Sequence, residues 1–99
     1  MSEDRAESVV IKITDLDIKP GFKGSFLIGK DKAGAEFHFA LRPDTLVRKI
    51  SPAESTLLLS DLVRQNSSPP FRIGETVVVA WKIDPSTHQQ TAVKITTLE

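Results

Sequence analysis

The stretch SFLIGKDKAGAEFHFALR, residues 25–42, holds two short runs of aromatic and aliphatic residues joined by the polar connection DKAGA. Runs of this length and composition are typical of β-strands. The connection has the length of a hairpin loop, and Gly34 within it can adopt a positive φ. The stretch therefore predicts a β-hairpin with strands over residues 25–31 and 36–42.

The period of two in a β-strand assigns the side chains of this hairpin to faces. Phe37 and Phe39 share one face of the second strand, and His38 lies on the other. Phe26 and Ile28 share a face of the first strand. We expect Phe26, Ile28 and Phe37 to be core residues, and Phe39 fits either the core or the surface.

Three further strands and one helix are predicted outside this hairpin. Residues 8–18, 75–83 and 91–98 are rich in β-branched residues and are bounded by polar or proline- and glycine-containing segments. Between the third and fourth strands, Ser51 is a suitable N-cap and Glu54 completes a capping box, with proline at the first helical position. These signals predict a helix over about residues 52–65, with Leu58, Leu59, Leu62 and Val63 as its apolar stripe.

The order of three strands, one helix and two strands is the layout of a five-stranded OB-type β-barrel, in which the helix covers one end. A β-sandwich and an SH3-like barrel are competing interpretations, but neither accounts as naturally for the capped helix. We therefore predict an all-β protein with one helix. Residues 8–99 form a single OB-type barrel domain, and residues 1–7 form a disordered acidic tail.

The composition is that of a globular domain, with 39% hydrophobic and 26% charged residues among 99. No run approaches the ~20 apolar residues of a membrane span, so no membrane contact is expected. The polar start MSEDRAES is neither a secretory signal nor a transit peptide. The chain has no cysteine and is thus compatible with a reducing cytoplasm, where we expect the protein.

Charge is balanced over the whole chain but not along it. Thirteen basic and thirteen acidic residues give a formal net charge of zero, whereas dedicated nucleic-acid binders usually carry a basic excess. Between Lys19 and Lys49, however, seven basic residues stand against three acidic ones. This third of the chain is the candidate contact for a polyanionic partner.

Two parts of the chain resemble the cold-shock domain. KGSFLIGKDKAGAEFHFAL is similar to the family's K-G-F-G-F-I strand, turn and V-F-V-H-F strand, and IGETVVVAWKIDPSTHQQTAVKITTL is similar to its closing hairpin. Members bind single-stranded RNA or DNA by stacking bases on outward aromatic rings, at ~1–3 kcal/mol per base. The matched positions imply binding through Lys23, His38 and Phe39, while Ser25, Leu27 and Glu36 replace stacking rings of the family.

The leading expectation is a non-enzymatic module that binds single-stranded RNA or DNA. Trp81 and Lys82 extend the set implied by the resemblance, since Trp81 on the open barrel face would form a reduced stacking site with His38. The turn and hairpin add further lysines and one ring. The complete candidate set is Lys19, Phe22, Lys23, Lys30, Lys32, His38, Phe39, Trp81 and Lys82.

Two alternatives remain open. The same barrel, with its stacking platform lost, is also suited to a protein–protein interaction through the helix at 52–65 and the adjoining loop NSSPPF. The segments FKGSFLIGKDKAGAEFHFAL and GETVVVAWKI are also similar to the TOBE-type barrel of ABC-importer ATPases, which implies an accessory domain.

Catalysis is not expected. His38 and His88 lie far apart in a chain without cysteine, and no H-E-x-x-H spacing is present. No serine stands in a G-x-S-x-G elbow, and no glycine-rich phosphate loop is found. We therefore expect no catalytic residues, no metal and no cofactor.

Overall fold

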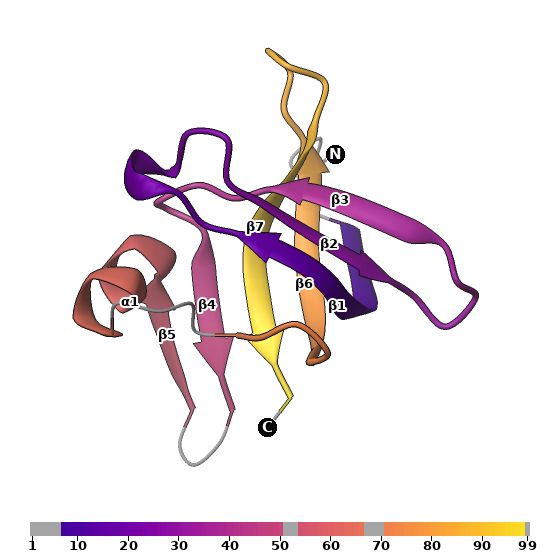
Figure 1. Ribbon diagram of the computed structural model, residues 1–99, viewed down its shortest axis with the longest axis horizontal. Helices are drawn as coiled ribbons and strands as arrows, with labels where there is room; N and C mark the ends of the chain where they lie inside the picture. Colours follow the sequence, from indigo (N-terminus) through magenta and orange to yellow (C-terminus); the bar gives the residue numbers. More distant parts are fainter. Residues whose placement is uncertain (1–6, 51–53, 67–70, 99) are drawn as a thin grey trace, which may run out of the picture.

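The computed structural model describes residues 7–50, 54–66 and 71–98 (Figure 1). The elements follow in the order β1 (Glu7–Asp17), the 3-10 turn η1 (Pro20–Phe22), β2 (Phe26–Lys30), β3 (Glu36–Ala40), β4 (Leu46–Lys49), β5 (Ser55–Leu58), α1 (Leu59–Asn66), β6 (Thr76–Ile83) and β7 (Gln90–Thr97).

Five of these strands close into a barrel. Strand β1 pairs antiparallel with β2 and with β6, β2 pairs with β3, and β6 pairs with β7. The circle closes where Ala40 of β3 meets Thr91 of β7 in parallel. This arrangement confirms the predicted fold class, a mostly-β protein with a closed five-stranded barrel and one helix ahead of the last two barrel strands.

The predicted tail is one residue too long at its inner end. Glu7 already belongs to β1 and lies opposite Trp81 of β6. Residues 1–6 lie outside the described residues.

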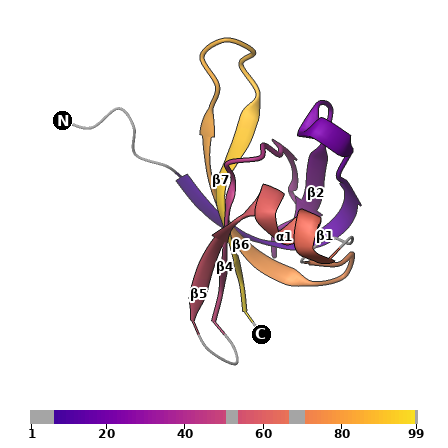
Figure 2. The same ribbon diagram turned by 90° about the vertical axis from the view of Figure 1, so that its left-hand side faces the viewer.

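A hairpin that the sequence did not predict extends the barrel sheet. Strand β4 pairs in parallel with β7, beyond the point where β3 contacts it, and β5 pairs antiparallel with β4. Figure 2 shows this hairpin leaving the barrel, with β5 as its outer strand. The edge of β5 that faces away from β4 has no neighbouring strand among the described residues.

The helix prediction over 52–65 is wrong at its start. Residues 55–58 form β5, and α1 begins at Leu59, whose N–H donates to the carbonyl of Thr45 at 2.8 Å. The predicted cap residues 51 and 52 lie outside the described residues, and Glu54 accepts a hydrogen bond from Nε of Arg48 at 2.8 Å. Strand β4 gives this segment cross-strand partners, and these tertiary contacts override the local helix signal.

The core fills the barrel and continues beneath α1. Its buried apolar residues are Ile11, Ile13, Leu27, Phe39, Leu41, Val47, Leu59, Leu62, Phe71, Val77, Val79, Ala92 and Ile95. The ring of Phe39 is 1% exposed, and its centroid lies 5.9 Å from that of Phe37 and 6.0 Å from that of Trp81. Phe37 packs against the core, as predicted.

Strand β2 faces the opposite way from the prediction. Leu27 is fully buried, whereas Phe26 and Ile28 are half-buried on the outer side. Gly29 shares the inner side with Leu27, and a Cβ there would lie 2.7 Å from Cδ1 of Ile11 and 2.8 Å from the carbonyl oxygen of Lys12. The close approach of β1 thus leaves no room for an inward side chain at position 29, and the outer side receives the large ones.

Candidate nucleic-acid interface

An open groove of approximately 1180 Å³ crosses the outer side of β2 and β3. Outward side chains of the two strands line it in cross-strand pairs, Phe26 opposite Ala40 and Ile28 opposite His38. The η1 loop over residues 21–25 and the β6–β7 loop over residues 87–90 also line it. Two strands and two loops therefore form one concave surface.

Both loops place a non-glycine residue in the left-handed backbone region. Phe22 has a φ of 66° and His88 a φ of 61°, and both line the groove. Each turn is fixed by backbone hydrogen bonds: Phe22 N–H donates to the Lys19 carbonyl at 2.9 Å, and His88 N–H donates to the Asp84 carbonyl at 2.8 Å. This conformation costs roughly 1–2 kcal/mol for an L-residue, and such strain tends to cluster at functional sites.

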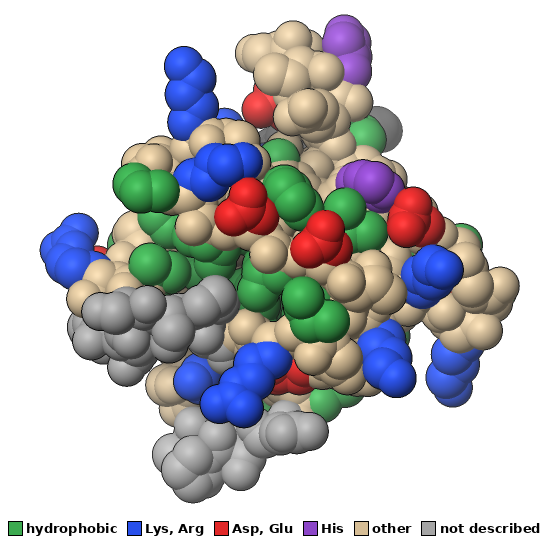
Figure 3. Space-filling view, viewed as in Figure 1, with side chains coloured by type: hydrophobic (Ala, Val, Ile, Leu, Met, Phe, Trp, Pro, Cys, Tyr) green, Lys and Arg blue, Asp and Glu red, His purple; other side chains and the backbone are tan. Residues whose placement is uncertain are grey.

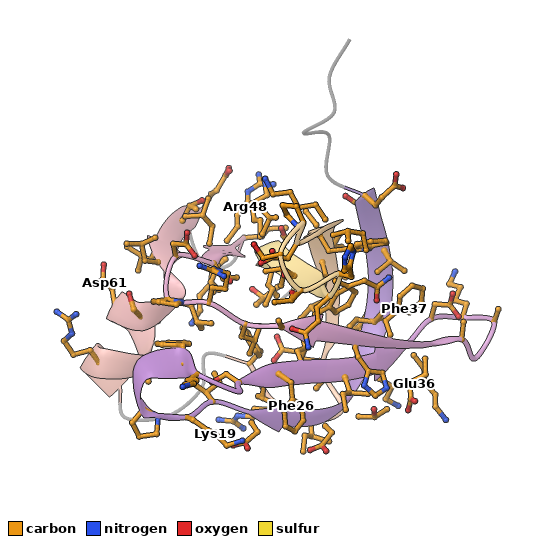
Figure 4. The ribbon with its side chains drawn as sticks, turned by 90° about the horizontal axis from the view of Figure 1, so that it is seen from above. Lys19, Phe26, Glu36, Phe37, Arg48 and Asp61 are labelled. Carbon is orange, nitrogen blue, oxygen red and sulfur yellow. The ribbon has the colours of Figure 1, made fainter. Side chains whose placement is uncertain are left out.

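A lysine lies over the aromatic ring of the groove. The Nζ atom of Lys19 is 5.8 Å from the ring centroid of Phe26, 3.1 Å from Oδ2 of Asp17 and 3.3 Å from the carbonyl oxygen of Gly24. Asp17 lies directly across from Phe26 in the β1–β2 pairing. Figure 4 shows Lys19 and Phe26 together on the outer side of β2.

A contact between a histidine and a carboxylate lies farther along the same surface. Nε2 of His38 is 3.0 Å from Oε1 of Glu36, and both side chains are more than half exposed. Figure 3 shows acidic side chains among hydrophobic ones across this face, with a histidine beside one of them. The face thus carries both signs of charge, unlike the uniformly basic surface of a dedicated nucleic-acid binder.

The structure divides the predicted site residues into three groups. Phe22, Lys23 and His38 line the groove, and Lys19 reaches it through the Phe26 ring. Two lysines of the candidate set, Lys30 and Lys32, lie at the far end of the β2–β3 hairpin and do not line the groove.

The remaining three are placed differently from the expectation. Phe39 is not a stacking residue, because alternation in β3 points its ring into the core and leaves it 1% exposed. Trp81 does not join His38, because its indole packs against Phe39 on the inner side of β6. Lys82 borders an adjoining pocket of approximately 320 Å³, which shares Arg42 and Ile83 with the groove.

Several groove residues were missed by the sequence analysis, chiefly Phe26, Ile28, Arg42 and His88. One signal could have placed Phe26 outward. A glycine inside a strand often marks a close backbone approach. Gly29 therefore indicates that the strand face on which it lies is the inner face, which leaves Phe26 on the outer face. No comparable signal exists for the positive φ of His88.

Within the part of the chain that the structure describes, no group of three or more His, Cys, Asp or Glu side chains could hold a metal ion. None of the described helices is long and apolar enough to span a membrane. Comparison of the chain with protein family models, curated proteins and solved structures finds no match.

Proposed function

We propose that this protein is a non-enzymatic module that binds single-stranded nucleic acid in the groove over β2 and β3. The observation that carries the proposal is the outward ring of Phe26 within a groove bounded by the η1 loop and the β6–β7 loop. In OB-type barrels this face and these two loops bind oligonucleotides. The resemblance to cold-shock domains supports the same face.

The chemistry of the groove suits a flexible strand. Bases stack on the Phe26 ring and on the imidazole of His38, while Phe22 bounds the same groove from the η1 loop. Lys23 and Arg42, which also line the groove, supply positive charge for phosphates. The resemblance pointed to positions 25 and 27 for stacking, but both side chains are buried, so Phe26 takes that role in the proposal.

Few rings and a mixed charge limit the affinity. With one phenylalanine and one histidine on the β-strand surface, we expect weak binding that falls with salt and has little sequence preference. RNA and DNA are both candidates.

The test is fluorescence anisotropy with end-labelled single strands of about a dozen nucleotides, RNA and DNA, at low and physiological salt. Phe26→Ala is expected to weaken binding about 5- to 150-fold, the effect of losing one stacked base at ~1–3 kcal/mol. Lys32→Ala, outside the groove, is the matched control and should reduce affinity much less. Absence of binding at low salt by the folded protein would refute the proposal.

A second candidate function rests on β5. All four of its residues are exposed, with Leu57 at 41% and Leu58 at 39%, and one edge of the strand is open among the described residues. Such an edge can accept an extended peptide as an additional strand. On this alternative the partner protein contacts β5 rather than the helix face expected from the sequence. The TOBE-type likeness adds no separate site to these two candidates.

Peptide selection would test the second candidate. A displayed library of random peptides is selected on the wild-type protein and then on Leu57→Asp. Extended apolar peptides retained by the wild type and lost on the variant would support a β5 site. Equal recovery on both proteins would exclude it.

A further inference from the structure

We infer that Asp17 and Glu36 set the affinity of the groove by holding Lys19 and His38, so that a single strand has to compete with two carboxylates of the protein itself. The inference rests on the proposed function. Neither acidic residue belongs to the proposed contact with the strand.

The first carboxylate holds Lys19 over the stacking ring. Asp17 Oδ2 and the Gly24 carbonyl oxygen fix the Lys19 ammonium at 3.1 and 3.3 Å, and the ammonium lies over the Phe26 ring. A base that stacks on this face of the ring displaces the ammonium. A phosphate that binds Lys19 also takes the place of Asp17.

The second carboxylate acts on the neighbouring strand. Glu36 Oε1 lies 3.0 Å from Nε2 of His38, on the outer side of β3 where His38 lines the groove. The imidazole is thereby oriented toward the hairpin end, and a negative charge lies beside the path of the strand. A polyanion approaching His38 is repelled by Glu36 until the two side chains separate.

These pairs contribute little to folding. The side chains of Asp17 and Lys19 are 45% and 49% exposed, and those of Glu36 and His38 are 51% and 64% exposed. Exposed side-chain pairs of this kind have small effects on stability. Their effect on a polyanionic ligand is larger, because Asp17 neutralises the Lys19 ammonium and Glu36 places a negative charge beside His38. Removing the carboxylates should therefore change binding and leave the fold unchanged.

The experiment measures single-strand affinity against salt concentration for Asp17→Asn, Glu36→Gln and the control Asp15→Asn. Asp15 lies on the same outer face of β1 and has no ion-pair partner among the described residues, so it gives the same change of charge without releasing a cation. We expect Asp17→Asn to bind about three- to tenfold more tightly than the wild type, and Glu36→Gln to shift in the same direction. Asp15→Asn should change affinity less than about twofold.

The salt dependence separates a released cation from a general change of charge. For a single strand the slope of log K against log salt changes by about 0.7 for each additional phosphate that the protein neutralises. Asp17→Asn should steepen the slope by about this amount, and Asp15→Asn should not. If the wild type binds, and Asp17→Asn and Asp15→Asn have the same affinity and the same salt slope as each other, the inference is overturned and the proposed function stands. Failure of the wild type and of Asp17→Asn to bind at low salt would overturn both.

Discussion

Alanine substitution at Phe39 and at Phe26 should separate folding from binding. The two rings lie on adjacent strands, but Phe39 is 1% exposed and contacts the rings of Phe37 and Trp81, whereas Phe26 is half-buried on the groove side. Figure 4 shows Phe26 and Phe37 on different sides of the β2–β3 ribbon. One ring therefore belongs to the core and the other to the candidate interface.

The expected magnitudes differ enough to be measured. Truncating a fully buried phenylalanine costs about 3–5 kcal/mol, so Phe39→Ala should lose that amount of unfolding free energy. For a domain of this size the loss corresponds to a fall in Tm of roughly 15–25 °C. Phe26→Ala should lose about 1 kcal/mol or less of stability, because its ring already contacts solvent.

Urea denaturation followed by far-UV circular dichroism measures both variants under the same conditions. Circular dichroism is preferable to Trp81 fluorescence, since the indole contacts the ring removed in Phe39→Ala. If that variant does not fold, Phe39→Leu should still lose about 1–2 kcal/mol. A larger loss for Phe26→Ala than for Phe39→Ala would show that the facing of the two strands is the reverse of that described.

Three further substitutions test the packing and turns that support the groove, each by urea denaturation. Gly29→Ala should lower the free energy of unfolding by about 1–3 kcal/mol, because its Cβ would lie 2.8 Å from the carbonyl oxygen of Lys12. An unchanged urea midpoint would mean that β1 can move away from β2. Thr45→Val should cost about 1–3 kcal/mol, since the buried hydroxyl donates to the carbonyl of Ala92 at 2.9 Å, and stability equal to wild type would show that this bond is dispensable. Asp31→Ala should lower the free energy of unfolding by about 1 kcal/mol, because Oδ1 accepts hydrogen bonds from the N–H groups of residues 33 and 35 at 3.0 and 2.9 Å. Asp31→Asn keeps an acceptor and should lose less stability.

Local sequence patterns predict where the barrel strands lie, but in β2 they do not determine which face of the strand points into the core. Alternation located β1, β2, β3, β6 and β7 to within two residues of their observed ends. In β2, however, Phe26, Leu27 and Ile28 are consecutive and apolar, so both parities are compatible with a core. The choice is made by Ile11 of β1, which fills the space beneath Gly29, and that contact is invisible in a local pattern.

The β4–β5 hairpin was missed for a related reason. Leu46–Lys49 is only four residues long and contains one fully buried side chain, Val47, so its period is too short to detect. Without β4 as a partner, residues 55–58 continue the helix that the capping signal of Ser51 and Glu54 predicts, and that signal is the stronger local feature. The groove lies over the same two strands as the predicted hairpin, but the ring on its outer side is that of Phe26, whereas Phe39 is 1% exposed.

The pairing of β1 with β6 has a consequence for how fast the chain reaches its native state. Glu7 lies opposite Trp81 and Lys12 opposite Thr76, so a first strand and a late one have to meet before the barrel can close. Contacts between such distant positions require a large loop to be closed early, and domains dominated by them fold in milliseconds to seconds. Until the barrel closes, the edge of β3 that contacts β7 has no partner, so we expect intermolecular strand pairing to occur mainly during refolding, and more of it in concentrated or heated solution.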